Sequence, residues 1–226
     1  MVSHCSGCKA FTLQPIGKQI QKGKTIKCTP AVGATANKDC ANCGFCTHIG
    51  GPFYSDIIHN REFIARMLDH ILKTGHKYGT KDRMLGMLTL QSEELDTPFF
   101  YSLPVMMSVL HCQAPPISKF VSAILNAGYK VSESHTAQSA IKTDAPMEVV
   151  YDVVRGWCKL NPPLEKRIKE NSAAKRILSV EPKITANFEL HPDAVAPSRK
   201  HRFVRFQINP TANWGPMTRP KKARIE

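Results

Sequence analysis

The spacing of apolar residues separates an N-terminal stretch without helical periodicity from a longer helical region. From Asn60 onward, apolar side chains recur every three or four residues, which places them on one face of an α-helix. A first helix should begin near Asn60 and stop at Gly75, and a second should begin at Thr80 and end at Asp96–Pro98. Their apolar faces would hold Phe63, Ile64, Met67, Leu68, Ile71 and Leu72, and Met84, Leu85, Met87, Leu88 and Leu95.

The same reasoning predicts three more helices and a two-stranded ribbon before residue 161. Pro104 is compatible with a helix start because proline is tolerated in the first turn, and alternating side chains indicate strands. The predicted elements are a short helix from Ser102, a helix over 117–126, strands over 129–135 and 140–143, and a helix entered at Asp144–Pro146 with Val149, Val150, Val153, Val154 and Trp157 on its apolar face.

This order of elements is that of a winged-helix domain. The helix over 117–126 would then occupy the position of the recognition helix. Its one basic residue is Lys119, so a purely packing role is an equal alternative. The sequence therefore predicts an α+β fold with a winged-helix-like domain at 51–160. This domain is preceded by a cysteine-rich, zinc-ribbon-like module at 1–50 and followed by a basic extension at 161–210 and a basic, disordered tail at 211–226. Within the extension, a basic helix is expected over 164–178 and a strand over 184–190.

Composition and charge narrow the classes of protein. With 42% apolar residues among 226, the chain can bury a core. It has no apolar run of the ~18 residues that a membrane span needs, and its first ten residues do not resemble a secretory leader. The net charge of +13 is concentrated: 1–50 carries +5, 155–183 carries +5 and 199–226 carries +7. Clustered positive charge is typical of proteins that bind nucleic acid, although solvated surface is the alternative.

Cysteine spacing gives the strongest local signal. Cys5 and Cys8 form one Cys-x-x-Cys pair, and Cys40 and Cys43 form another. Two such pairs provide four thiolates for a tetrahedral, closed and therefore structural zinc site. Cys46, Cys28 and His4 are weaker alternative ligands, and Cys112 and Cys158 are expected to be core thiols.

Other polar residues are weaker candidates. Asp56 and His59 are close in sequence, but no third group completes a catalytic set, which favours a structural or capping role. Lys142 is a candidate phosphate ligand, or else Asp144 only starts a helix. Alternating cations and aromatics over 198–206 suit RNA, since rings and guanidinium groups stack on bases. The predicted RNA-binding residues are Arg199, Lys200, Arg202, Arg205, Lys142, Lys221 and Lys222. No Gly-rich nucleotide loop is visible, and no catalytic residue is assigned.

Taken in order, a series of short segments resembles the C-terminal half of the eukaryotic tRNA (guanine(26)-N(2))-dimethyltransferases. Each segment is weak alone, but the ordered series is specific and spans nearly the whole chain. The segments are Cys5–Cys8, Cys40–Gly44, Gly50–Pro52, Ile58–Asn60, Ser92–Leu95, Tyr101–Leu103, His111–Cys112, Ser122–Tyr129, Ile141–Pro146, Arg176–Leu178 and Asn213–Pro216.

The resemblance implies a tRNA substrate, S-adenosylmethionine as methyl donor, and transfer of two methyl groups to one guanine amine. It implies that this part holds tRNA beside an N-terminal methyltransferase domain, with the cofactor loop and the Asp-Pro-aromatic catalytic motif upstream of residue 1. It assigns zinc to the four paired cysteines, and a location in the nucleus, with the mitochondrion as an additional location. The alternatives are a zinc-ribbon and winged-helix DNA-binding regulator, or a paralogue with altered activity.

Overall fold

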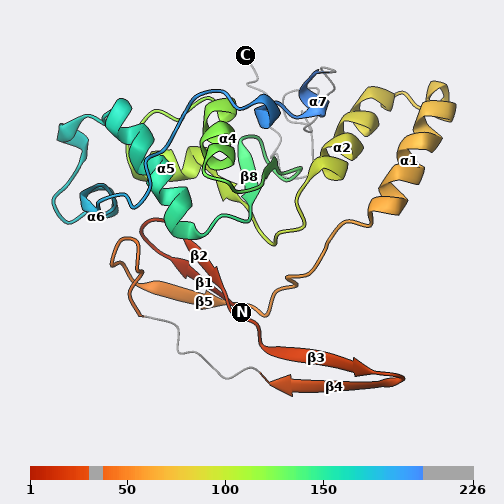
Figure 1. Cartoon of the computed structure of the whole chain (residues 1–226), viewed down its shortest axis with the longest axis horizontal. Helices are drawn as coiled ribbons and strands as arrows, with labels where there is room; N and C mark the ends of the chain where they lie inside the picture. Colours follow the sequence, from red (N-terminus) through yellow and green to blue (C-terminus); the bar gives the residue numbers. More distant parts are fainter. Residues whose placement is uncertain (31–37, 201–226) are drawn as a thin grey trace, which may run out of the picture.

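The structure, a computed structural model, describes residues 1–30 and 38–200 and is a mixed α/β fold (Figure 1). The strands are β1 (Val2–Cys5), β2 (Phe11–Leu13), β3 (Gly17–Lys22), β4 (Thr25–Pro30), β5 (Thr47–Gly50), β6 (Tyr101–Ser102), β7 (Val131–Glu133) and β8 (Ala140–Thr143). The helices are α1 (Arg61–Thr74), α2 (Lys81–Glu93), α3 (Leu103–Val109), α4 (Ile117–Asn126), α5 (Met147–Leu160), α6 (Ala173–Ser179) and α7 (Pro197–Lys200). No helix among these residues has both the length and the apolar character needed to cross a bilayer.

The first fifty residues are more regular than their sequence suggested. Strands β2, β1 and β5 form an antiparallel sheet in that order, with Val2 opposite both Leu13 and Gly50. Strands β3 and β4 form a separate hairpin, which stands away from the rest of the molecule (Figure 1). Short strands with mixed polar and apolar residues gave no clear alternation from which to predict them.

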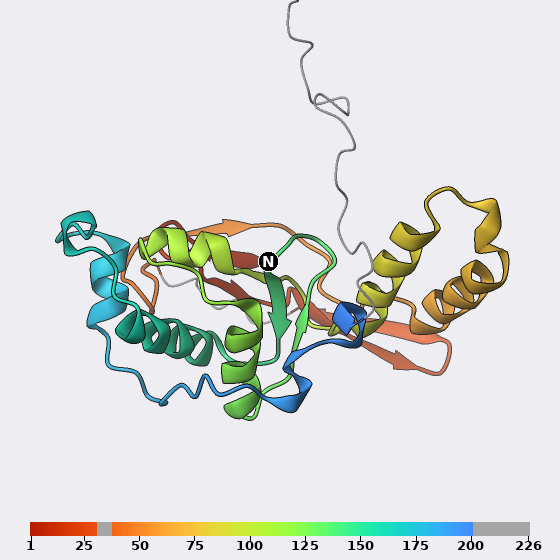
Figure 2. The same ribbon diagram turned by 90° about the horizontal axis from the view of Figure 1, so that it is seen from above.

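Helices α1 and α2 pair with each other and form an arm at one end of the molecule, as Figures 1 and 2 show. The helix α1 begins where predicted, because the Asn60 side chain accepts a hydrogen bond of 2.9 Å from the Phe63 amide. Thr80 occupies the N-cap position of α2 without a side-chain cap bond, and α2 ends at Glu93, before the predicted end. The two helices enclose a small cluster of their own, made of Ile64, Ile71, Leu85 and Leu88.

The main core lies between α3, α4, α5 and a second sheet with the order β6-β8-β7. The predicted ribbon corresponds to β7 and β8, and the unpredicted β6 pairs with β8 on its other side, with Tyr101 opposite Ile141. The apolar face of α5 is buried as expected, and Val150, Val153 and Val154 have no solvent exposure. The helical periodicity from Ser102 to Leu160 therefore identified the three core helices correctly, but not strand β6.

The segment after α5 differs from the sequence prediction. The expected helix over 164–178 is reduced to a 3₁₀ turn at Glu165–Arg167 and helix α6. Residues 184–190 form no strand; instead, the Asn126 side chain donates to the carbonyl oxygens of Asn187 and Glu189, each at 3.0 Å. Phe188 packs against Trp157 with ring centroids 5.5 Å apart. Ile184, Ala186 and Phe188 pack against the main core without pairing with another strand, whereas Leu190 is exposed.

Candidate metal centre

Four thiols converge at one end of the N-terminal sheet. Strand β1 ends at Cys5, and β5 begins at Thr47, directly opposite Cys5. Because the two strands are antiparallel, the turn that follows β1 and the turn that precedes β5 lie at the same end. Each turn carries one Cys-x-x-Cys pair, and the four sulfur atoms lie within 4.8 Å of one another.

The backbone of both turns is held by hydrogen bonds that the sequence supports. The Cys5 amide donates to the Ala10 carbonyl at 2.8 Å, and the Gly44 amide donates to the Cys40 carbonyl at 2.7 Å. Gly44 has a φ of 67°, a conformation that glycine adopts without steric cost. A side chain at Gly7 would place its Cβ 2.8 Å from the Phe45 ring, so glycine lets the two turns pack closely.

The geometry and chemistry of these thiols suit a soft divalent metal. All four are buried, with at most 8% of each residue exposed. The Cys5 and Cys43 sulfurs are 3.3 Å apart, and those of Cys8 and Cys40 are 3.6 Å apart. These separations exceed the ~2.05 Å of a disulfide bond. They approach the roughly 3.8 Å edge of a tetrahedron with ~2.3 Å metal–sulfur bonds.

Burial and hydrogen bonding shift the pKa values of three of these thiols, Cys5, Cys40 and Cys43. Burial raises the pKa of Cys40 to about 11 and raises the pKa of Cys43 as well. Burial acts in the same direction on Cys5, but hydrogen bonds from backbone amides and from Cys43 outweigh it and lower the pKa of Cys5. A metal bound here would therefore displace protons from thiols, since the thiolate is the ligand.

Polar side chains of α5 and α6 attach the cysteine turns to the main core. The Tyr151 hydroxyl donates to the Cys8 carbonyl at 2.6 Å, and the Arg155 guanidinium donates to the Asn42 side chain at 2.6 Å. Arg176 donates to the Gly44 carbonyl at 3.1 Å and lies over the Phe45 ring. The four cysteines belong to the same buried cluster as α3, α4 and α5. The candidate metal centre is thus part of the main core.

The remaining cysteines and His4 do not belong to the group of four converging thiols. Cys28 and His4 are exposed, and Cys46 is exposed with its sulfur 3.3 Å from the Ser6 hydroxyl. Cys158 is buried, as expected of a core thiol, and burial raises its pKa. Cys112 is half-buried in the turn after α3, where its thiol donates to the Asn161 carbonyl at 3.0 Å.

A second polar cluster, centred on Glu94, was not predicted. The Glu94 side chain has no solvent exposure and accepts bonds from His59 at 3.2 Å and Ser134 at 3.2 Å. The Lys142 ammonium lies 3.0 Å from the same carboxylate, which also accepts from the backbone and ring of His135. These groups come from the segment before α1, the end of α2, the loop after β7, and β8. A buried glutamate gives no periodic signal, so the sequence could not indicate it.

The Glu94 cluster is an ion cluster with a structural role. His59, Glu94 and His135 place donor atoms within 4.8 Å of one another, as a metal site would. However, the positive charge of Lys142 on the same carboxylate opposes a divalent cation. The structural role expected for His59 agrees with this arrangement, whereas Asp56 is exposed and its carboxylate accepts only a local bond from the Ile57 amide. Among the described residues, no hydrogen bond or ion pair joins Asp56 to His59.

The predicted RNA-binding residues differ in their exposure and in their ion pairs, and four of them lie outside the described residues. Lys142 is 3% exposed and paired with Glu94, so its ammonium cannot reach an external phosphate, and that prediction is wrong. Arg199 is one-third exposed and forms a bidentate pair with Glu133. Lys200 ends α7. Arg202, Arg205, Lys221 and Lys222 lie outside the described residues.

Comparison with known proteins identifies relatives over the whole chain. Residues 1–155 match the family model described as N2,N2-dimethylguanosine tRNA methyltransferase. A tRNA (guanine(26)-N(2))-dimethyltransferase of Schizosaccharomyces pombe is 43% identical, with 100% of this chain and 42% of the relative aligned. The enzyme of the same name from Mus musculus is 41% identical over 98% of this chain and 34% of the relative. The chain therefore spans about two fifths or less of the length of these relatives.

Two further matches complete the comparison. A tRNA (guanine(26)-N(2))-dimethyltransferase of Saccharomyces cerevisiae, named as mitochondrial, is 33% identical over 96% of this chain and 42% of its own length. A solved Trm1 from Pyrococcus horikoshii, in complex with S-adenosyl-L-methionine, is 20% identical and aligns with 59% of this chain and 33% of its own. Its TM-score is 0.41, which does not establish a shared fold.

Replacing Glu94 with glutamine should destabilise the fold by about 3–5 kcal/mol, because Lys142 would be left buried without its counter-charge. Chemical denaturation measures this, with Glu181→Gln as the exposed control, expected to change stability by less than ~0.5 kcal/mol.

The stabilisation of the fold by Glu94 should depend on pH. Burial would raise the pKa of Glu94, but hydrogen bonds from His135 and Lys142 outweigh it and lower the pKa below the ordinary value of 4.5. The stabilisation should therefore be complete above about pH 4.5 and disappear as the pH falls through the lower, folded-state pKa. Wild type and Glu94→Gln should converge in stability at acid pH; a constant difference down to pH 2 would contradict this.

Proposed function

Because the chain belongs to the N2,N2-dimethylguanosine tRNA methyltransferase family, we propose that it is the zinc-bearing, tRNA-binding C-terminal part of a tRNA (guanine(26)-N(2))-dimethyltransferase. The observation that carries the proposal is this family membership together with a buried set of four cysteine thiols. The resemblance drawn from the sequence agrees with it. The alternative, a DNA-binding regulator, is not favoured, since the relatives are tRNA methyltransferases.

Zinc is the metal that fits the donor set best. Four thiolates with no open position are typical of structural zinc sites, in which zinc binding contributes to folding. Two cysteine turns at one end of an antiparallel sheet support a zinc-ribbon-like interpretation of residues 1–50. In this proposal the ligands are Cys5, Cys8, Cys40 and Cys43. Zinc here would hold the two turns together and perform no chemistry on the substrate.

The central domain supports a winged-helix-like interpretation. Its elements follow in the order α2, β6, α3, α4, β7 and β8, and β8 lies between β6 and β7. In such a fold α4 would be the recognition helix. Its basic residue Lys119 lies over the Trp157 ring, 6.0 Å from the centroid, and the helix buries most of its middle. We therefore assign α4 a packing role and assign tRNA contact to the basic segments of the chain.

The proposed tRNA-contacting residues lie at the C-terminal end. Arg199, Lys200, Arg202, Arg205, Lys221 and Lys222 belong to the segment that carries seven net positive charges. Positive side chains release counterions from phosphates and thus supply affinity with little sequence preference. Because Arg199 is already paired with Glu133, it should contribute less than its neighbours.

The methyl-transfer chemistry belongs, in this proposal, to a domain outside this chain. The chain aligns with about two fifths or less of its relatives, and its sequence contains no Gly-rich nucleotide loop. That domain would bind S-adenosylmethionine and act on a guanine of the tRNA held by this part. The location proposed for the protein is the nucleus, with the mitochondrion as an additional location, in line with the relative named as mitochondrial.

Replacing Cys40 with serine should remove one of four metal ligands. We expect bound zinc to fall from one per chain to well below one, with loss of cooperative unfolding, because structural zinc contributes ~10 kcal/mol or more in small zinc modules. Elemental analysis of dialysed protein and thermal unfolding measure this.

Cys28→Ser is the matched control for the metal analysis, since this exposed cysteine lies outside the cluster. It should keep one zinc and an unchanged unfolding temperature. Equal zinc content in the Cys40 and Cys28 variants would disprove the assignment.

The division of labour predicts binding without catalysis. The chain should bind tRNA more tightly than duplex DNA of equal charge at the same salt concentration, measured by competition. It should form no dimethylguanosine with S-adenosylmethionine, as judged by mass spectrometry of nucleosides. Methylation by this chain, or preference for the DNA duplex, would contradict the proposal.

A further inference from the structure

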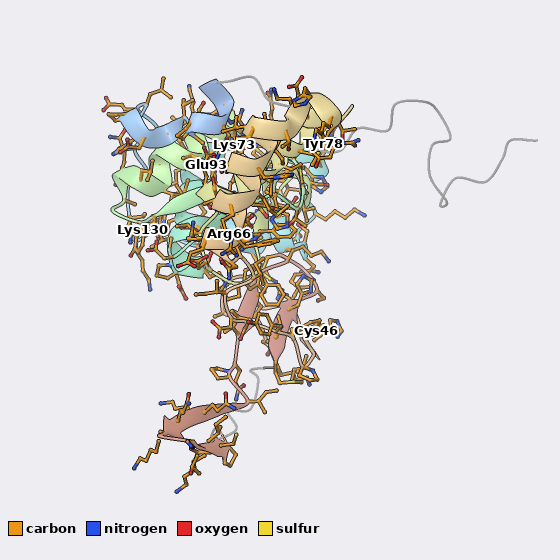
Figure 3. The ribbon with its side chains drawn as sticks, turned by 90° about the vertical axis from the view of Figure 1, so that its right-hand side faces the viewer. Cys46, Arg66, Lys73, Tyr78, Glu93 and Lys130 are labelled. Carbon is orange, nitrogen blue, oxygen red and sulfur yellow. The ribbon has the colours of Figure 1, made fainter. Side chains whose placement is uncertain are left out.

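The β3–β4 hairpin buries none of its strand residues against the rest of the described structure. Every residue of both strands is exposed, from Gly17 to Lys22 and from Thr25 to Pro30. Figures 1 and 3 show it standing away from the body, with its side chains projecting into solvent. A lone two-stranded hairpin is marginally stable in water, so a surface of this kind is best explained by a partner.

Strand register separates the hairpin into two chemically different faces. Directly paired residues share a face, and alternate residues along a strand point to opposite faces. Lys18 pairs with Thr29, Ile20 with Lys27 and Lys22 with Thr25, and these six residues form one face, here called the lysine face. The opposite face consists of Gly17, Gln19, Gln21, Ile26, Cys28 and Pro30 and carries no charge.

The charge on the lysine face is unbalanced. No Asp or Glu occurs between residues 17 and 30, and Lys24 at the tip adds a fourth cation. Lys27 is diagonal to both Lys18 and Lys22, at the roughly 7–8 Å spacing at which like charges repel. At ~3.4 Å per residue, Lys18 and Lys22 are about 14 Å apart along the strand. Such a row of cations, flanked by the hydroxyls of Thr25 and Thr29, fits a row of phosphates.

We propose that the lysine face is a phosphate-binding surface for RNA, which the tRNA-binding role proposed above would use in addition to the C-terminal segment. The inference rests on that role and adds a separate element to it. RNA fits better than a lipid surface, because the lysine face carries one apolar side chain, Ile20, whereas membrane-binding elements need a broad apolar face. The hairpin would hold the RNA backbone without reading its sequence.

The test compares two variants that lose the same charge in the full chain. One is Lys18→Gln, Lys22→Gln and Lys27→Gln combined on the lysine face. The control combines Arg66→Gln, Lys73→Gln and Lys77→Gln, which are exposed residues of α1 and the turn after it. Both variants should keep wild-type zinc content and unfolding temperature, because all six residues lie on the surface.

The lysine-face variant should bind tRNA about 10- to 100-fold more weakly near 0.1 M salt. The slope of log affinity against log salt concentration should become less steep, by an amount that corresponds to about two to three lost phosphate contacts. The control should lose less than about threefold. Equal losses in the two variants, or no loss in either, would overturn the proposal while leaving tRNA binding intact. Failure of the wild-type chain to bind tRNA would overturn both the hairpin and the function. Weaker binding to phosphatidylserine vesicles with unchanged tRNA binding would assign the hairpin to membranes instead.

Discussion

The convergence of four buried thiols is the constraint on which the rest of the structure depends. Two Cys-x-x-Cys turns more than thirty residues apart meet because β1 and β5 are antiparallel neighbours. Four sulfur atoms at this spacing could hold one metal ion, and a bound metal would also close the long connection between the two turns. That connection contains the β3–β4 hairpin. A metal held by the four thiols would therefore also fix both ends of the segment that carries the proposed RNA-binding surface.

The same site is continuous with the helical core, and buried polar groups make the joint specific. Tyr151 and Arg155 of α5 donate hydrogen bonds to the two cysteine turns, and Asp152 pairs with Arg155. Glu94 also connects separate segments, because its carboxylate contacts His59 in the segment before α1 and Lys142 in β8. Buried polar contacts of this kind fix one arrangement, because each unpaired partner would be costly.

Sequence reasoning predicted what local spacing encodes and missed what only tertiary contact creates. Helix α1 is capped by Asn60, α4 spans residues 117–126, and the four cysteines come together, since periodicity and paired thiols are local signals. It failed at residues 184–190, where three of the alternating apolar residues pack on the main core, and at Lys142, whose partner Glu94 is distant in sequence. The two faces of the hairpin were equally hidden, because they depend on the register of β3 against β4.

The central claim concerns what the four thiols hold, and X-ray absorption at the zinc edge of the purified chain tests it most directly. The account predicts a first shell of four sulfur scatterers at about 2.3 Å and no nitrogen or oxygen. A shell with imidazole nitrogen, or with fewer than four sulfurs, would place the metal elsewhere and would contradict the assignment of Cys5, Cys8, Cys40 and Cys43 as its ligands.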